Sequence, residues 1–129
     1  MPATRATPAD RATAVEWPSV ERFGSIEVDV AKLRDYCLSE THPRGRHKAR
    51  VFGSRLGLTA GDADLLRQSL LDAARVHQGD LRATDVDEYG QRYVLDFEMT
   101  TASGTAIVRS AWIVVASEDV LRFISCYVL

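Results

Sequence analysis

The chain has 129 residues and a formal net charge of −2 at pH 7, with 46% hydrophobic and 26% charged residues. These values are typical of one globular domain, and the absence of any run of about 18 apolar residues excludes a transmembrane helix. Cys37 and Cys126 form no CxxC pair, and the three histidines lack metal-ligand spacing. We therefore expect two reduced thiols in the core, no bound metal and no cofactor.

The first 22 residues differ in composition from the rest of the chain. They are rich in Ala, Thr, Pro and charged residues, and they lack the continuous apolar stretch of a secretory signal. We expect a flexible segment over residues 1–22, one domain over residues 23–129, and a cytoplasmic protein without membrane attachment.

Three helices are expected in the first half of that domain. Asp29 is a suitable N-cap for the first, and Gly57 is a suitable C-cap for the second. Thr59 and Asp62 form a variant capping box that opens the third, where apolar residues recur at helical spacing. The expected limits are residues 29–37, 47–57 and 59–76.

The sequence of the second half of the domain predicts strands. Residues 80–90 are polar and acidic, and we expect a loop there. From residue 92 to residue 99, apolar and polar side chains alternate, which is typical of a half-buried strand. Short turns then separate two further strands, over residues 105–116 and 120–128. Helices followed by an antiparallel sheet of three or more strands predict an α+β fold.

The stretch HPRGRHKAR, residues 42–50, concentrates positive charge in an acidic chain. No Asp or Glu occurs from residue 41 to residue 61. Solvated surfaces usually intersperse the two signs of charge, so this segment is expected to meet an anion. The alternative is an internal network in which Asp96 and Glu98 pair with its arginines.

A second motif, VRSAWIV, lies in the middle of the second predicted strand. Ser110 and Trp112 are two positions apart and share one face with Val108 and Val114, whereas Arg109 points the other way. Packing alone explains such a pair, with Trp112 as a core anchor. The functional alternative is that the hydroxyl binds phosphate and the indole stacks on a base.

Together the two motifs resemble known nucleases. HPRGRHKARVF, LGLT and VRSAWIV look like an uncharacterised family of small bacterial domains, some of which occur beside small partner proteins or on larger toxins. They are also similar to colicin D-type nuclease domains of the barnase/EndoU/colicin/RelE-like ribonuclease group. Those domains carry Lys-x-Lys-His in the helical part and Ser-x-Trp on a strand. Here Arg44-Gly45-Arg46-His47 and Ser110-Ala111-Trp112 correspond, with arginine replacing each lysine.

The resemblance implies a metal-independent, toxin-like endoribonuclease that cleaves tRNA or another structured RNA through 2′-hydroxyl attack. A histidine suits proton transfer near neutral pH, and fixed cations stabilise charge on the phosphorus centre. The candidate catalytic residues are His47, Arg46, Ser110 and Trp112. The candidate substrate-binding residues are Arg44, Lys48, Arg50, His42 and Tyr127.

Two other functions stay open from the sequence. The basic segment suits a non-catalytic domain that binds nucleic acid or an acidic protein, and equally an immunity-type partner protein. The partners to consider are RNA and, for a toxin, a small acidic inhibitor that covers the cluster. A toxin would also be delivered into another cell. The last predicted strand leaves an edge that a neighbouring chain could pair with, so the oligomeric state is open.

Overall fold

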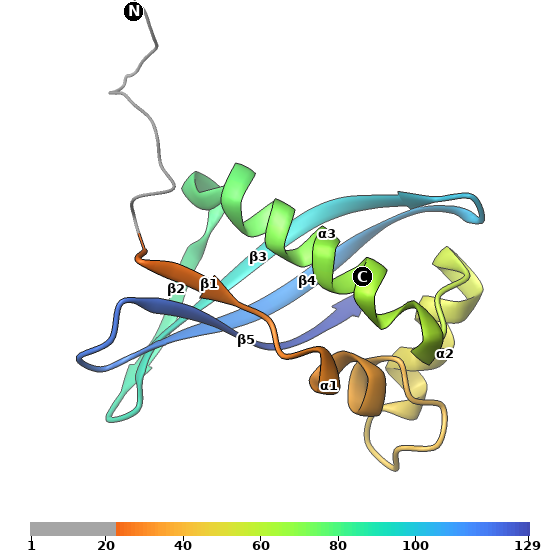
Figure 1. The fold of residues 1–129 in the computed structure, drawn as a ribbon, viewed down its shortest axis with the longest axis horizontal. Coiled ribbons are helices and arrows are strands. Elements are labelled where there is room, and N and C mark those ends of the chain that lie inside the picture. Colours follow the sequence, from red (N-terminus) through yellow and green to blue (C-terminus); the bar gives the residue numbers. More distant parts are fainter. Residues whose placement is uncertain (1–22) are drawn as a thin grey trace, which may run out of the picture.

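The computed structural model describes residues 23–129, and the expected flexibility of residues 1–22 lies outside this part (Figure 1). Five strands form one sheet in the order β1-β5-β4-β3-β2. Strand β1 runs parallel to β5, and the other neighbouring pairs are antiparallel. The strands are β1 (Ser25–Glu27), β2 (Arg82–Asp87), β3 (Gly90–Thr101), β4 (Gly104–Val115) and β5 (Val120–Val128).

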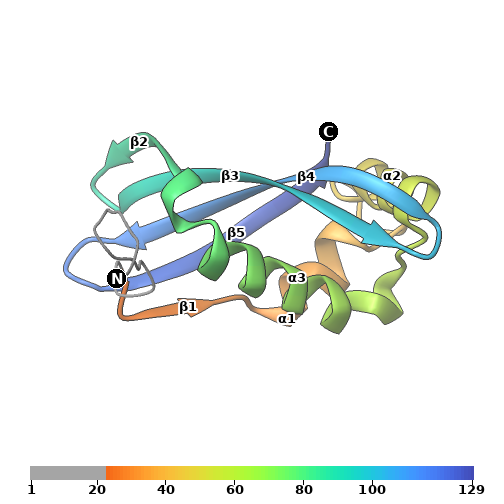
Figure 2. The same ribbon diagram turned by 90° about the horizontal axis from the view of Figure 1, so that it is seen from above.

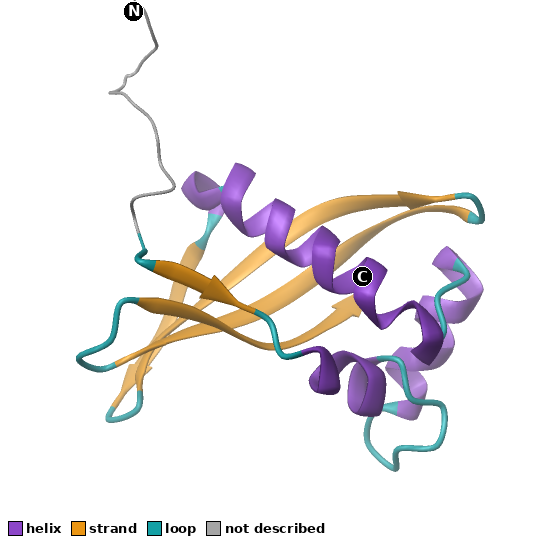
Figure 3. Cartoon of the chain, in the orientation of Figure 1, coloured by secondary structure: helices purple, strands orange, loops and turns teal. Residues whose placement is uncertain are grey.

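The helices precede the antiparallel strands in the chain, as the α+β prediction requires (Figure 3). Helix α3 lies across one face of the sheet, whereas α2 lies at the end of the sheet and contacts β4 and β5 (Figures 1 and 2). The helical elements are α1 (Val30–Lys32), the π-helical turn η2 (Leu33–Cys37), α2 (Arg46–Leu56), α3 (Ala63–Val76), and the 3₁₀ turns η3 (Ala60–Asp62) and η4 (Gln78–Asp80).

Local signals account for the helix limits. The Asp29 carboxylate accepts a hydrogen bond from the Ala31 backbone N–H at 2.9 Å and opens α1. Gly57 takes the left-handed conformation, with φ of 69°, and ends α2. The predicted capping box is present, because the Thr59 backbone N–H donates to Asp62 at 2.9 Å.

The prediction of a loop over residues 80–90 is wrong, because β2 occupies residues 82–87. Every residue of β2 is exposed, so the strand has no buried face and shows no apolar alternation. It is an edge strand held by backbone pairing with β3. Strand β1 also escapes prediction, because three residues are too few to display a period.

One face of the sheet carries the hydrophobic core. Side chains of α3 and of the segment before α2 cover residues of β3, β4 and β5 such as Leu95, Val108 and Leu121, which are completely buried. The opposite face carries no helix in the described part of the chain (Figure 2). Some of its residues, among them Arg109 and Tyr127, are half-buried, and others, such as Glu98 and Ile107, are exposed. We call this uncovered surface the open face.

Candidate functional site

The loop that leads into α2 is built around the imidazole of His42. Its Nδ1 accepts hydrogen bonds from the backbone N–H groups of Arg44 at 3.0 Å and Gly45 at 3.1 Å. Its ring packs edge-to-face on Tyr36, with 4.7 Å between the ring centroids. The two bonds need an unprotonated Nδ1. His42 therefore shapes the basic loop, although it was expected to bind substrate.

Gly45 fixes how closely this loop approaches the preceding helix. A Cβ atom at this position would collide with the backbone carbonyl oxygen of Tyr36. Gly45 is buried, while Arg44 and Arg46 on either side of it are exposed. The RGR sequence thus holds the backbone against the protein and directs both guanidinium groups towards solvent.

The cations of this segment have no acidic partner within the described residues. Arg44, Arg46 and Arg50 are exposed, and no Asp or Glu from residue 23 onward lies within ion-pair distance of them. Asp96 instead accepts two hydrogen bonds from Arg109, both of 2.8 Å. The alternative in which Asp96 neutralises the basic loop is therefore not the observed arrangement.

The positive end of the helix dipole adds to this charge. Helix α2 begins at Arg46 and has 11 residues, and its first turn contains no acidic residue. Partial positive charge at a helix N-terminus favours anions, as do the exposed guanidinium groups. His47, the second residue of α2, is exposed within this field. We call the exposed side chains of Arg44, Arg46, His47 and Arg50 the basic surface.

Lys48 connects the basic surface to the open face of the sheet. Its ammonium nitrogen lies 5.5 Å from the centroid of the Tyr36 ring and 5.3 Å from that of Tyr127, so two aromatic faces hold it. Tyr127 stands opposite Arg109 in the β4–β5 register. The pKa of Arg109 is raised, first by its hydrogen bonds to Asp96 and then by Tyr127.

The two thiols lie in the core, close enough to Lys48 for its charge to act on them. Cys37 and Cys126 are both unoxidised and buried, as predicted. A hydrogen bond from the Cys126 thiol lowers the pKa of Cys37 to about 7, and the charge of Lys48 contributes to this shift. Burial raises the pKa of Cys126, as does its proximity to Cys37.

Ser110 and Trp112 lie in the core, with no exposed surface. The Ser110 hydroxyl donates to the Leu95 carbonyl at 2.7 Å and accepts from the Trp112 indole N–H at 2.9 Å. The indole also packs edge-to-face on Phe123. Their polar groups therefore bond to each other and to the backbone. This placement corrects the expectation that they contact RNA directly, and it agrees with the packing alternative.

The structure thus divides the candidate residues into three groups. The exposed side chains of the basic surface lie at the start of α2, and Lys48 contacts Tyr127 beside them. His42 supports the loop. Ser110 and Trp112 are separated from all of these by their burial in the core.

Sequence reasoning did not identify Tyr36 and Arg109 as neighbours of this site. Tyr36 gave no signal, because its contact with Lys48 crosses a loop. Arg109 could have been found, because it points away from Ser110 and Trp112 and Asp96 lies among the polar positions of the preceding strand, and opposite charges pair across neighbouring strands.

The fold and this site define a small α+β domain with a basic helix start beside an uncovered sheet face. Residues 18–129 match the family described as a domain of unknown function, DUF6883, and the chain belongs to that family. None of the curated proteins compared matches it.

Among solved structures, a chain of a contact-dependent growth inhibition toxin–immunity protein complex from Klebsiella pneumoniae 342 is similar in fold. The TM-score is 0.63 and the identity 17%, over 79% of this chain and 98% of that chain. At this identity the likeness establishes a shared fold. In the described residues, no helix is both long and apolar enough to span a membrane.

Proposed function

We propose that this chain is a toxin-type domain that binds RNA through the basic surface and cleaves its phosphodiester backbone. One observation carries the proposal. Exposed arginines without acidic partners among the described residues gather at a helix N-terminus, beside Lys48 and two aromatic rings. Surface charge that is not used internally is available for a polyanion.

The arrangement suits a nucleic acid better than a small anion. Arg44, Arg46 and Arg50 would bind successive phosphates, because guanidinium groups match phosphate oxygens with paired hydrogen bonds. Tyr127 offers an aromatic surface on the open face for an unstacked base. Lys48, held between Tyr36 and Tyr127, would keep that ring in place and add positive charge to it.

His47 is the group proposed to move protons. As a base it would take the proton of a ribose 2′-hydroxyl, whose oxygen then forms a bond to phosphorus while the bond to the 5′-oxygen breaks. The products are a 2′,3′-cyclic phosphate and a 5′-hydroxyl, which takes up a proton. The arginines would stabilise the extra negative charge at the phosphorus centre.

The fold comparison supports a role in conflict between cells. The similar chain comes from a toxin–immunity protein complex. If this chain is the toxin member, a small acidic protein would inhibit it by covering the basic surface. Delivery into a target cell would then form part of its action.

Cleavage of total bacterial tRNA in EDTA tests the proposal. We expect discrete cuts that end in 2′,3′-cyclic phosphate, and a loss of about 10²–10⁴-fold in rate for His47→Ala. The matched control is His77→Ala, which removes another exposed histidine, on the far end of α3. Equal rates for wild type and His47→Ala, or no cuts by the folded wild-type protein, would refute cleavage by this site.

The second candidate is an immunity-type protein that uses the same surface to bind a partner protein. It is favoured by the same comparison, since the similar fold occurs in a complex of a toxin with its immunity protein. In that case wild-type protein would not cut tRNA. Charge reversal at Arg44 and Arg46 would instead abolish a stable complex with an acidic protein.

A further inference from the structure

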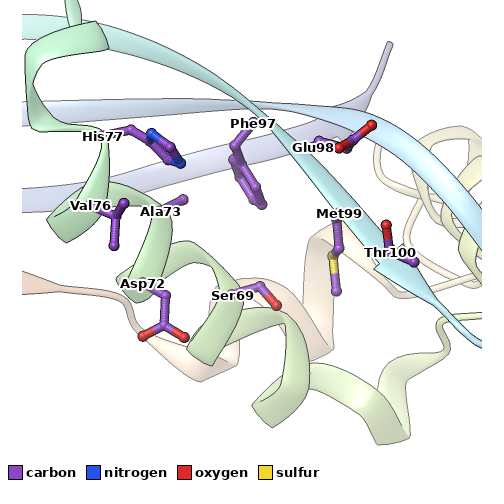
Figure 4. A pocket seen from close by; sticks show the side chains of 9 residues that line it. All are labelled: Ser69, Asp72, Ala73, Val76, His77, Phe97, Glu98, Met99 and Thr100. Atoms are coloured by element: carbon purple, nitrogen blue, oxygen red, sulfur yellow. The ribbon is translucent and has the colours of Figure 1, made fainter.

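A groove unconnected with the basic surface lies between α3 and β3 (Figure 4). Its volume is about 280 Å³. Phe97 and Met99 of β3, which are 8% and 5% exposed, form its apolar floor with Ala73 of α3, and Val76 of α3 is exposed at its margin. The polar side chains at its margin come from both elements and are Ser69, Asp72, His77, Glu98 and Thr100.

Strand β3 has a free edge along this groove. Strand β2 pairs with β3 only from Gly90 to Val94. Strand β4 pairs with the other side of β3 over its whole length, from Gly90 to Thr101. Within the described chain, residues 95–101 of β3 therefore have a strand neighbour on one side only (Figure 1). Unpaired backbone N–H and C=O groups at an edge are a template for an added strand.

Apolar surface beside the free edge favours an extended polypeptide as the ligand. Successive side chains of an added strand alternate between the two faces of the sheet. Every second one would enter the groove over Phe97 and Met99. A helix lying beside an open edge strand is an arrangement in which backbone pairing supplies affinity and alternate pockets supply selectivity. The exposure of Val76, at 72%, leaves apolar surface available at the margin.

The charge of the margin indicates which segment would bind. Asp72 and Glu98 are both exposed. Asp72 accepts a hydrogen bond from the neutral Gln68, and Glu98 has no ion pair with any described residue. The Nδ1 atom of His77, the imidazole in the groove, lies 3.7 Å from Oδ2 of Asp80. The carboxylates are thus available to cations on a bound strand.

We propose that this groove binds an extended, lysine- or arginine-bearing segment of a partner protein, which pairs with β3 over residues 95–101. Apolar side chains of the segment face Phe97 and Met99. Basic side chains at the alternate positions lie on the outer face, next to Glu98. This interaction surface is independent of the proposed RNA cleavage, because it uses the opposite charge and other elements.

The test is a titration of the full-length, ¹⁵N-labelled protein, followed by NMR. The probe is the peptide acetyl-Thr-Lys-Val-Lys-Val-Lys-amide. One comparison peptide carries Glu in place of Lys. The other is methylated on alternate backbone nitrogens and so loses its strand-pairing donors. We expect amide shifts confined to residues 95–101 and the groove side of α3, with the lysine peptide binding most tightly.

Protein variants locate the charge effect. Glu98→Gln should weaken binding of the lysine peptide by roughly twofold or more, as expected for one exposed ion pair. Glu88→Gln, an exposed carboxylate in the β2–β3 turn, is the matched control and should leave binding unchanged.

Several outcomes would overturn the proposal. They are amide shifts outside residues 95–101 and α3, no binding at millimolar peptide, or binding of either comparison peptide as tight as that of the lysine peptide. Concentration-dependent shifts of β3 without peptide would identify a second copy of the chain as the occupant. Contacts from residues 1–22 to Phe97 or Met99 in the free protein would identify that segment instead.

Discussion

The start of α2 and the middle of β4 carry the two motifs that drew attention in the sequence, and they have opposite surroundings. Arg44, Arg46 and His47 are exposed, and the backbone at Gly45 is packed against the protein. Ser110 and Trp112 have no exposed surface, and their polar groups are bonded to each other and to Leu95.

This contrast separates two uses of polar residues. In β4 the Ser110 hydroxyl accepts a hydrogen bond from the Trp112 indole N–H and donates one to a backbone carbonyl. The large aromatic side chain is therefore buried without an unpaired donor. At the start of α2 the guanidinium groups of Arg44 and Arg46 are exposed and form no ion pair with any described residue. Polar side chains are thus used internally in one region and left exposed to solvent in the other. The predictions below test that division, from the largest expected effect to the smallest.

Replacing Trp112 with alanine should affect stability and not RNA binding. Loss of a buried tryptophan side chain typically costs about 3–5 kcal/mol of unfolding free energy. Urea denaturation followed by circular dichroism measures the change. Trp112→Phe is the control and should cost less, because it keeps much of the buried ring. A Trp112→Ala protein of unchanged stability with lost RNA binding would reverse the assignment.

Ser110→Ala should give a smaller loss of stability, of about 1–3 kcal/mol, because the Trp112 N–H would lose its buried acceptor. The matched control is Ser54→Ala, which removes an exposed hydroxyl from α2 and should change stability by less than about 0.5 kcal/mol. Both are measured in the same denaturation experiment. Identical stabilities for the two variants would contradict the core role of Ser110.

Arg44→Ala with Arg46→Ala should weaken RNA binding by about tenfold and leave stability within about 0.5 kcal/mol. The slope of log affinity against log salt should become shallower by roughly 1.5, for two lost phosphate contacts. Filter binding of tRNA at several salt concentrations measures both quantities.

The control for that pair is Arg34→Ala with Arg75→Ala, which changes net charge equally at exposed sites elsewhere. If this control shifts the salt slope as much, the RNA contacts are spread over the surface. The basic surface would then have no special role.

Asp96→Asn should have the smallest effect on stability, and the effect should depend on pH. Hydrogen bonds from Arg109 lower the pKa of Asp96. A lowered pKa in the folded state stabilises the protein above the ordinary Asp value of about 3.9, and this stabilisation is lost as pH falls through the folded-state pKa. The variant should therefore be less stable at neutral pH and lose less stability on acidification. Denaturation midpoints from pH 7 to pH 2 test this, and parallel curves would contradict it.

The sequence by itself determined the elements that depend on neighbouring residues. Caps at Asp29 and Gly57, the capping box at Thr59 and the alternation in β3 are local signals, and they gave the α+β class correctly. The excess of positive charge over residues 42–50 was also readable, because the composition of a short segment does not depend on contacts.

The tertiary structure decided which polar groups are exposed and which elements pair. Ser110 and Arg109 are adjacent in sequence, yet one is buried under helices and the other lies on the open face. The contact of Lys48 with Tyr36 and Tyr127 joins three elements across the fold. Strand β2 exists because β3 offers backbone partners, although its own side chains are all exposed. Burial and pairing depend on residues distant in the chain, so local pattern specifies the elements while packing assigns their roles.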